Sequence, residues 1–437
     1  MSVTASSSQF DKPSTLPASL YRDTARPAVP TLPLEGKRQC DVAILGGGYT
    51  GLSAALRLAQ KGRTVRVLEA NEPGWGASGR NGGQVNPGLK WEPEQIERDF
   101  GPDLGKRMVA LSGGAPAQVF DLVSRHNIAC EARQSGTLRA AFAPRDAETI
   151  SRTAEAWMAR AMPIQYLDRD AVQKATGTDR YINGVIDHRG GMLNPLGYAR
   201  GLCEAAIAAG AGVHGGSRVR SVCRQAGRWK VTTERGEVQA DWLVLATNGY
   251  TDDLWKDLRR TVVPVFSGIV ASEPLSEALT SVILPERPSV YEIGSITTYY
   301  RLDENGRMLI GGRSVLSSRS GPEPFKGLSR YACRLWPSLQ SCRWTHGWNG
   351  RVAVTTDYYP HFHEPAQNVI AALGYNGRGV AMATAMGGEI ARRILGTPAS
   401  ELDMPVTDIR PIPFHAFWPV GAALRIAYGR IRDALEL

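Results

Sequence analysis

The stretch that decides the fold is residues 41–70, DVAILGGGYTGLSAALRLAQKGRTVRVLEA. Its first five residues are a short, mostly apolar run that predicts a buried strand, and the leucine spacing after Gly51 predicts a helix that ends at Gly62. Residues 64–68 predict a second strand, with Glu69 at its end. This order of strand, glycine-rich turn, helix and strand is one unit of a doubly wound α/β sheet.

The turn contains G-x-G-x-x-G, completed by Gly46, Gly48 and Gly51. The first glycine makes the turn, the second lets a diphosphate approach the backbone, and the third lets the helix pack against the strand. The N–H groups at the start of the helix, at Tyr49 and Thr50, attract that diphosphate. The pattern therefore predicts a dinucleotide site, and the alternative is a glycine-rich loop in an ordinary α/β unit.

Glu69, followed by Ala70, stands where an acid accepts hydrogen bonds from the two ribose hydroxyls of an adenosine. The same carboxylate would repel a 2′-phosphate, which argues against NADP. An NAD-dependent dehydrogenase would explain Glu69 but not the glycine-rich motifs that follow. A non-catalytic nucleotide-binding module is the more distant alternative.

Three later segments extend the expected site. Residues 74–88, GWGASGRNGGQVNPG, would place many N–H groups along an anion or a flat ring. Residues 240–250, ADWLVLATNGY, end a strand in a small polar loop, where open α/β sheets bind ligands. Residues 374–379, GYNGRG, join an apolar strand over 369–373 to a helix that runs to Leu395.

Length and composition limit the class of protein. A chain of 437 residues favours two domains. The net charge of +9 is scattered, without a block of like charges or a basic stripe with aromatic residues, so we expect no nucleic-acid partner. The six cysteines lack C-x-x-C spacing, and no signal peptide or spanning helix is evident. We expect a cytoplasmic protein with reduced thiols.

Alternating segments over 261–344, with the hairpin signal Asn305-Gly306, predict a second, antiparallel sheet in an α+β domain. The tail carries an amphipathic helix with Arg425, Arg430 and Arg432, which either docks on its own protein or lies on a membrane. The expected organisation is a mobile arm over 1–37, a discontinuous nucleotide-binding domain over 38–90, 195–260 and 345–400, a substrate domain over 91–194 and 261–344, and a tail over 401–437.

The motifs together resemble the glycine oxidase/D-amino acid oxidase superfamily of FAD-dependent oxidoreductases. The resemblance is carried by DVAILGGGYTGLSAALRLA, VLEA, GASGRNGGQ, ADWLVLATNGY and GYNGRGVAMATAMGGEIARRILG. Within the superfamily the chain looks most like the γ-glutamylputrescine oxidases, through DHRGGMLNPL, TTYYRL and RWTHGWNG. The resemblance implies a Rossmann-type FAD-binding domain and covers nearly all of the chain beyond about residue 18.

The resemblance also implies which residues hold FAD. Gly46, Gly48, Gly51 and Glu69 would hold the adenosine diphosphate half, and Val219 the adenine edge. The remaining implied contacts are Ala246, Thr247 and Asn248 near the pyrophosphate, Gly76, Ala77, Ser78, Arg80, Asn81, Gly82, Gly83 and Gln84 along the ribityl chain and isoalloxazine, and Gly374, Tyr375, Asn376, Gly377, Arg378, Gly379 and Val380 near flavin N1 and O2.

Two departures from the family pattern matter. Some relatives bind FAD covalently through a His in the second motif or a Cys before the last sheet, but this chain has Arg80 and Asn81 in that motif and no Cys over 351–357. We therefore expect noncovalent FAD. Arg378 stands where many relatives have a His, and its guanidinium would stabilise negative charge on reduced flavin. The alternative is an Arg paired with a surface acid.

The implied reaction is oxidation of a C–N bond in an amine or amino acid, with hydride passing to flavin N5, hydrolysis of the imine, and reoxidation by oxygen or a respiratory acceptor. No side-chain base is required. Tyr299 and Arg301 alternate on one strand and are the expected substrate contacts, although Arg301 could instead pair with Asp303 at the surface. Arg313 is a weaker candidate.

Two points remain open. The runner-up substrate is a cyclic or N-alkyl amino acid such as pipecolate, whose carboxylate Arg301 would hold. A γ-glutamyl polyamine instead has its carboxylate far from the oxidised amine. His361 and His363 have no third ligand nearby, so we read them as loop residues and expect no metal.

Overall fold

The computed structural model describes residues 2–4, 15–294, 297–314 and 317–434. Two large sheets, of ten and eight strands, organise the chain, and a two-stranded sheet pairs β4 (Gln84–Val85) with β8 (Gly191–Met192). Residues 1 and 5–14 of the predicted arm, and residues 435–437 of the predicted tail, lie outside the described residues.

The ten-stranded sheet has a parallel centre in the order β9, β3, β2, β12, β19. β2 pairs with β12 along its whole length, so both strands end together and Gly46 comes to lie beside Ala246. The strands are β1 (Ser2–Thr4), β2 (Gly36–Leu45), β3 (Val65–Leu68), β9 (Gly212–His214), β10 (Ser221–Gln225), β11 (Arg228–Thr232), β12 (Gly236–Leu245), β18 (His361–Ala366), β19 (Val369–Leu373) and β20 (Val406–Thr407).

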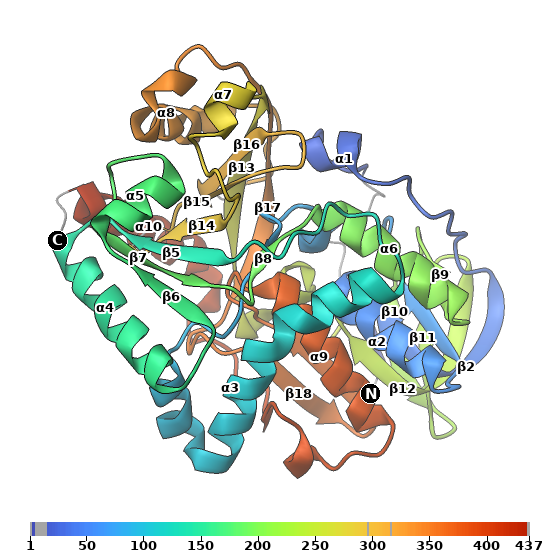
Figure 1. The fold of residues 1–437 in the computed structure, drawn as a ribbon. Coiled ribbons are helices and arrows are strands. Elements are labelled where there is room, and N and C mark those ends of the chain that lie inside the picture. The colour runs from blue at the N-terminus through green and yellow to red at the C-terminus, as the bar shows by residue number, and fades with distance from the viewer. Residues whose placement is uncertain (1, 5–14, 295–296, 315–316, 435–437) are drawn as a thin grey trace.

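Helices cover this sheet (Figure 1). A core of buried hydrophobic side chains lies between the helices and the sheet. α2 (Tyr49–Gln60) packs between α6 (Pro195–Ala208) and α9 (Gly379–Ile394), and α9 also contacts α3 (Pro93–Arg125). The periodicity of the sequence predicts two helices, over 92–100 and 104–126. In the structure a kink divides α3 between these ranges, because Gly101 adopts a non-helical conformation with φ 79°. No helix within the described residues combines the length and apolar content needed to cross a bilayer.

The eight-stranded sheet runs in the order β17, β13, β16, β15, β14, β5, β7, β6. The predicted hairpin joins β15 to β16, and every pair is antiparallel except β14 with β5. The strands are β5 (Thr137–Ala141), β6 (Ile164–Leu167), β7 (Asn183–Asp187), β13 (Val263–Pro274), β14 (Ser289–Glu292), β15 (Tyr299–Leu302), β16 (Arg307–Arg313) and β17 (Trp344–Val354). The remaining helices are α1 (Leu20–Thr24), α4 (Pro144–Ala159), α5 (Arg169–Thr176), α7 (Glu277–Thr280), α8 (Lys326–Leu335) and α10 (Trp418–Ala434).

Three local expectations need correction. β17 was expected in the nucleotide-binding domain, but it pairs with β13 and forms the edge of the other sheet. The described part of the N-terminal arm packs on the protein, where Leu20 and Tyr21 are buried and Tyr21 contacts the Trp348 ring. His361 and His363 belong to strand β18 rather than a loop, because β18 pairs with β19 on one side and β20 on the other.

Candidate functional site

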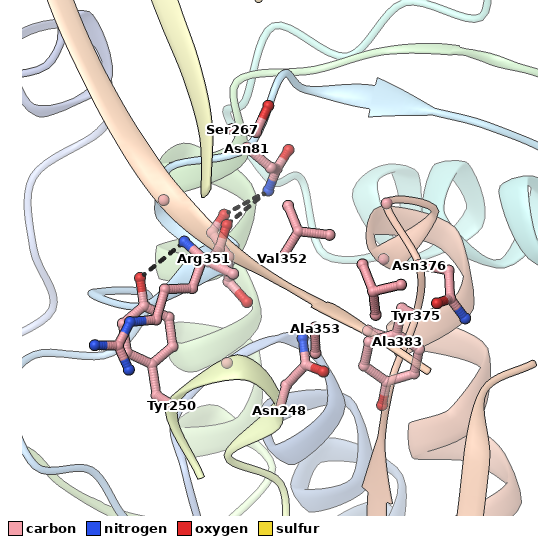
Figure 2. Close-up of a pocket in the computed structure, with 18 of the residues that line it drawn as sticks. Asn81, Asn248, Tyr250, Ser267, Arg351, Val352, Ala353, Tyr375, Asn376 and Ala383 are labelled. Atoms are coloured by element: carbon pink, nitrogen blue, oxygen red, sulfur yellow. Dashed lines mark hydrogen bonds between the residues drawn. The ribbon is translucent and has the colours of Figure 1, made fainter. Parts of the chain in front are cut away.

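A cavity of about 900 Å³ lies where the two sheets meet. Its walls come from the start of α2, the ends of β3 and β12, the loop after β3, one face of β13, the last residues of β17, and the start of α9. Figure 2 shows Asn81 and Ser267 at the top of this space and Asn248 at the bottom, with Val352 and Ala353 of β17 between them. The cavity thus joins the predicted nucleotide motifs to the predicted substrate sheet.

The G-x-G-x-x-G turn is closely packed, as its predicted role requires. A Cβ on Gly46 would lie 2.6 Å from the Ala246 carbonyl oxygen, and one on Gly51 would lie 2.1 Å from the Gly46 oxygen. A Cβ on Gly48 would lie 2.9 Å from Ser78 Oγ. The turn therefore has no room for side chains at Gly46, Gly48 and Gly51, and it brings the N-terminus of α2 to the cavity, which suits the approach of a diphosphate.

Glu69 lines the cavity at the end of β3. Its carboxylate accepts hydrogen bonds from the N–H groups of Gly47, at 2.7 Å, and Asn71, at 2.9 Å. Burial raises the pKa of Glu69, and these backbone donors oppose that rise. The two donors fix the carboxylate so that its other lone pairs face the cavity, where they could accept from hydroxyl groups.

The loop after β3 is fixed by its own polar side chains. Tyr49 donates its N–H to Ser78 Oγ at 3.0 Å and its hydroxyl to the Ser78 carbonyl at 2.6 Å. Asn81 donates to the Ala77 carbonyl at 3.1 Å and accepts from the Gly83 N–H at 2.8 Å. These bonds hold the loop in a single shape along the cavity wall.

The third motif closes the other side. Asn248 accepts the Gly374 N–H at 2.9 Å, and the hydroxyls of Tyr375 and Thr50 are 2.6 Å apart. Asn376 has a positive φ of 53° and accepts the Thr355 N–H through its side chain at 2.9 Å. The ends of β12 and β19 and the start of α2 are thereby tied together around one space.

Arg378 lines the cavity but has no acidic partner among the described residues. Its guanidinium donates to the Pro87 carbonyl at 2.6 Å and to the Tyr291 hydroxyl at 3.2 Å. The structure therefore does not show the alternative arrangement, in which Arg378 would pair with a surface acid. It keeps a full positive charge beside the cavity.

The cavity fits FAD in shape and in donor set. It is long, passes a glycine cradle that side chains would fill, and has a fixed acid at one end. Of the predicted cofactor residues, Gly51, Gly83 and Gly374 do not line it, and they serve close packing instead. Those that line it are Gly46, Gly48, Tyr49, Thr50, Glu69, Ala70, Gly76, Ala77, Ser78, Arg80, Asn81, Gly82, Gln84, Val219, Ala246, Thr247, Asn248, Tyr375, Asn376, Gly377, Arg378, Gly379 and Val380.

Tyr299 lies at the junction of the loop and the second sheet. Its ring occupies the space left by two glycines, because a Cβ on Gly82 would lie 2.5 Å from the ring and one on Gly311 would lie 2.3 Å from it. Its hydroxyl is 2.9 Å from Ser267 Oγ, and burial raises its pKa, so the phenol stays protonated. Tyr299 lines the cavity.

Arg301 is placed differently from the expectation. It does not line the cavity and is 2% exposed. Its guanidinium donates to the carbonyls of Gly82, at 2.8 Å, and Leu193, at 3.2 Å, and to the hydroxyl of Tyr21 at 3.3 Å. Arg301 thus stabilises the glycine-rich loop without lining the cavity. Asp303, its alternative partner, pairs with Arg307.

Sequence reasoning missed several cavity residues. Lys90 and Trp91 follow the glycine-rich loop directly, Tyr291 is on β14, and Arg425 is on α10. Arg313, the weaker candidate, lines the cavity from the end of β16. Tyr291 and Arg313 lie in segments whose alternating pattern indicates strands. No pattern in the residues around Lys90 indicated that it would line the cavity.

Comparisons with known proteins identify the family of this chain. The family model described as FAD dependent oxidoreductase (DAO) matches residues 41–393. The chain is 30% identical to the gamma-glutamylputrescine oxidoreductase of Escherichia coli strain K12, over 96% of this chain and 98% of that protein. It is 23% identical to the glycine oxidase of Bacillus licheniformis, over 83% and 95% of the two chains.

Solved structures show the same fold. The glycine oxidase of Geobacillus kaustophilus superposes with a TM-score of 0.69 at 20% identity, covering 82% of this chain and 95% of that one. The iminodiacetate oxidase of Chelativorans sp. BNC1 also gives 0.69, at 18% identity, over 84% and 99%.

Proposed function

Because the chain belongs to the DAO family of FAD-dependent oxidoreductases, and because the relatives named above act on an amine or an amino acid, we propose that it oxidises a C–N bond of a γ-glutamylputrescine-like amine. The observation that supports this most directly is the single cavity in which three glycine-rich motifs meet Tyr299 and Ser267 of the second sheet. FAD, when bound, supplies the two-electron acceptor for the C–H bond next to the amine nitrogen.

The chain's own residues would bind, orient and exclude water. Glu69 would hold the ribose hydroxyls, and the α2 N-terminus would hold the diphosphate. Val263 and Val265 line the cavity from the same face of β13 as Ser267, and so give the substrate side an apolar wall. The Tyr299 hydroxyl and Ser267 offer the polar contacts that fix the amine beside Gly82.

Cationic neighbours also favour the reactive form of the substrate. An amine must be neutral to lose the hydride equivalent. Arg378 lines the cavity, and positive charge close to an amine lowers its pKa. The site therefore needs no side-chain base.

We propose that FAD is held noncovalently. Relatives that attach it use a His or a Cys, and among the described residues neither type lines the cavity. Whether oxygen or a respiratory acceptor takes up the electrons afterwards is a separate part of the proposal, tested by the rate at which each reoxidises the reduced protein.

The direct test is the visible spectrum of the purified protein, followed by anaerobic addition of amines. We expect a flavin spectrum, release of the flavin on acid precipitation, and bleaching by γ-glutamylputrescine. Bleaching by pipecolate alone would favour the cyclic amino acid instead. A colourless protein that FAD does not reconstitute would contradict the flavoenzyme assignment.

Membrane contact through the tail remains a prediction. Phe417, Leu424 and Tyr428 are exposed along one side of the tail, while Ala422 and Ile426 line the cavity from the other side of α10. Cosedimentation with anionic vesicles, lost on Leu424→Asp, would support this contact, and absence of binding at low salt would exclude it.

A further inference from the structure

The cavity carries far more positive than negative charge. Its two lining acids are Glu69 and Asp252, both near the predicted adenosine end and both already engaged, Asp252 by Arg218 at 2.9 Å. Its lining cations are Arg80, Lys90, Arg218, Arg313, Arg351, Arg378 and Arg425. An apolar-walled space with this imbalance is built for an anion.

Four of the seven cations have contacts on the protein. Arg80 donates to the Trp75 carbonyl at 2.7 Å, Arg218 pairs with Asp252, and Arg378 donates to Pro87 and Tyr291. Arg351 lies 5.3 Å from the centre of the Tyr250 ring. These four are held by the protein whether or not a substrate is present.

Lys90, Arg313 and Arg425 are different. Within the part of the chain that the structure describes, none of them has an ion pair or a hydrogen bond to an acid, and Arg425 contacts only the Tyr428 ring, at 5.9 Å. They come from three separate elements, namely the segment between β4 and α3, the end of β16, and α10. We call these three residues the cationic cluster.

The three residues of the cluster line the same cavity as Ser267 and Tyr299. Arg313 lies directly opposite Ser267 in the register of β13 and β16, and Ser267 contacts the Tyr299 hydroxyl. The charge of Arg313 acts on Lys90, and that of Arg425 acts on Arg313. Like charges in a partly desolvated space repel one another, so an anion that enters between them is strongly stabilised.

We infer that the cationic cluster is a binding subsite for a substrate carboxylate that is not attached to the carbon being oxidised. The inference rests on the proposed function and deepens it, since it names the substrate class as amines that carry a distant carboxylate. The amine end would lie beside Tyr299 and Gly82, and the carboxylate end would lie toward α10. An amine with no acid group would leave the cluster without a counter-charge.

The test compares two amines that differ at one end only. N-glutarylputrescine carries a terminal carboxylate, and N-pentanoylputrescine has a methyl group in its place. We expect wild-type kcat/KM to favour the glutaryl compound by about 10- to 100-fold, as for charge-assisted hydrogen bonds. Lys90→Gln and Arg313→Gln should each remove about tenfold of that preference and leave kcat/KM for the pentanoyl compound within about threefold.

Conservative and matched variants keep the test decisive. Arg313→Lys should restore part of the preference, and Arg319→Gln, which removes an exposed charge outside the cavity, should leave it unchanged. A readout without turnover is the perturbation of the bound-flavin spectrum by glutarate, which should saturate in the wild type and weaken in both Gln variants.

Three outcomes would overturn the inference. Equal use of both amines by the wild type would remove the carboxylate subsite while leaving the proposed oxidase function in place. An equal loss on both amines in Lys90→Gln, with a shifted flavin midpoint potential, would assign the cluster to the flavin. If neither amine bleaches the flavin, the proposed function fails first, and absence of glutarate binding would then remove the subsite as well.

Discussion

At the scale of single residues, Gly48 shows why the nucleotide turn needs a glycine. Its backbone is extended, with φ −90°, a conformation open to any residue. What excludes a side chain is the space in front of it, where a Cβ would lie 2.9 Å from Ser78 Oγ. The requirement is therefore steric, and the atom that imposes it within the protein is Ser78 Oγ.

This argument predicts different results for a single and a double substitution. Gly48→Ala should weaken FAD binding at least about tenfold, because the methyl group occupies the approach of the diphosphate. Adding Ser78→Ala removes the contact within the protein but not the methyl group. We expect the double variant to stay weak in FAD titrations followed by flavin fluorescence. Recovery of wild-type affinity would instead mean that Gly48 only makes room for Ser78.

Arg301 leads to a second prediction at this scale. Three acceptors from three segments share its buried guanidinium, and a lysine ammonium has no fork to reach them all. Arg301→Lys should lower the free energy of unfolding by about 2–4 kcal/mol in denaturant titrations and weaken FAD binding, with little change in KM for the amine. The exposed Arg330→Lys is the control. A raised KM at unchanged stability would return Arg301 to the substrate site.

Lys90 gives a pH prediction. Desolvation, together with the positive charges of Arg378, Arg313 and Arg139, lowers the pKa of Lys90 to about 7. Arg139 is itself paired with Glu92 at 2.7 Å. Lys90 is charged below this pKa and neutral above it, so the affinity for glutarate should fall as pH rises from about 6 to 8. Lys90→Arg should flatten this profile, and an unchanged slope would count against the subsite.

At the scale of elements, what the sequence predicts well is what is local. The strand–turn–helix at 41–60 and the strand at 369–373 appear within a few residues of their expected limits, because apolar spacing and glycines act within one segment. The partner of β17 is not local, and nothing in its residues says which sheet it joins. Likewise, the alternation of side chains along a strand predicts that Tyr299 and Arg301 share one face. It does not predict how far along that face the cavity extends.

Strand β18 carries a prediction of this kind. His363 is 1% exposed, its Nδ1 hydrogen donates to the Thr407 carbonyl at 2.8 Å, and burial lowers its pKa to about 4. The His361 ring, Asp408 and Asp357 are the titratable groups that act on it. The unfolded chain takes up the proton at a higher pH than the folded protein does. The contribution of neutral His363 to the free energy of unfolding is therefore fully present above about pH 6.5 and is lost as the pH falls through about 4.

The size of this effect is about 3 kcal/mol over that range, from about 1.4 kcal/mol for each pH unit between the two pKa values. His363→Gln should flatten this part of the curve of unfolding free energy against pH, measured by urea titration. The neighbouring His361→Gln should retain it. The same slope in wild type and His363→Gln would show that another group titrates.

At the scale of the whole molecule, both sheets contribute to one cavity, so a ligand there binds to every large part of the fold. FAD at about a hundred times its dissociation constant should raise the free energy of unfolding by about 2.7 kcal/mol, seen as a higher Tm in the holo protein. ADP at the same concentration as FAD should give a smaller shift, because it reaches only the Glu69 end and so has a larger dissociation constant. Equal shifts from ADP and FAD would mean that the flavin half makes no net contact.

The parallel centre of the ten-stranded sheet has a consequence for biosynthesis. β2, α2 and β3 are made early, but β19, which pairs with β12, and the Gly374 motif are made near the end of the chain. Until β19 is made, the end of β12 over Leu243–Leu245 therefore has no partner on one side, an exposed edge that invites aggregation or chaperone binding. Flavin capture must wait for the last quarter of translation, so the supply of cofactor acts on finished chains and not on growing ones.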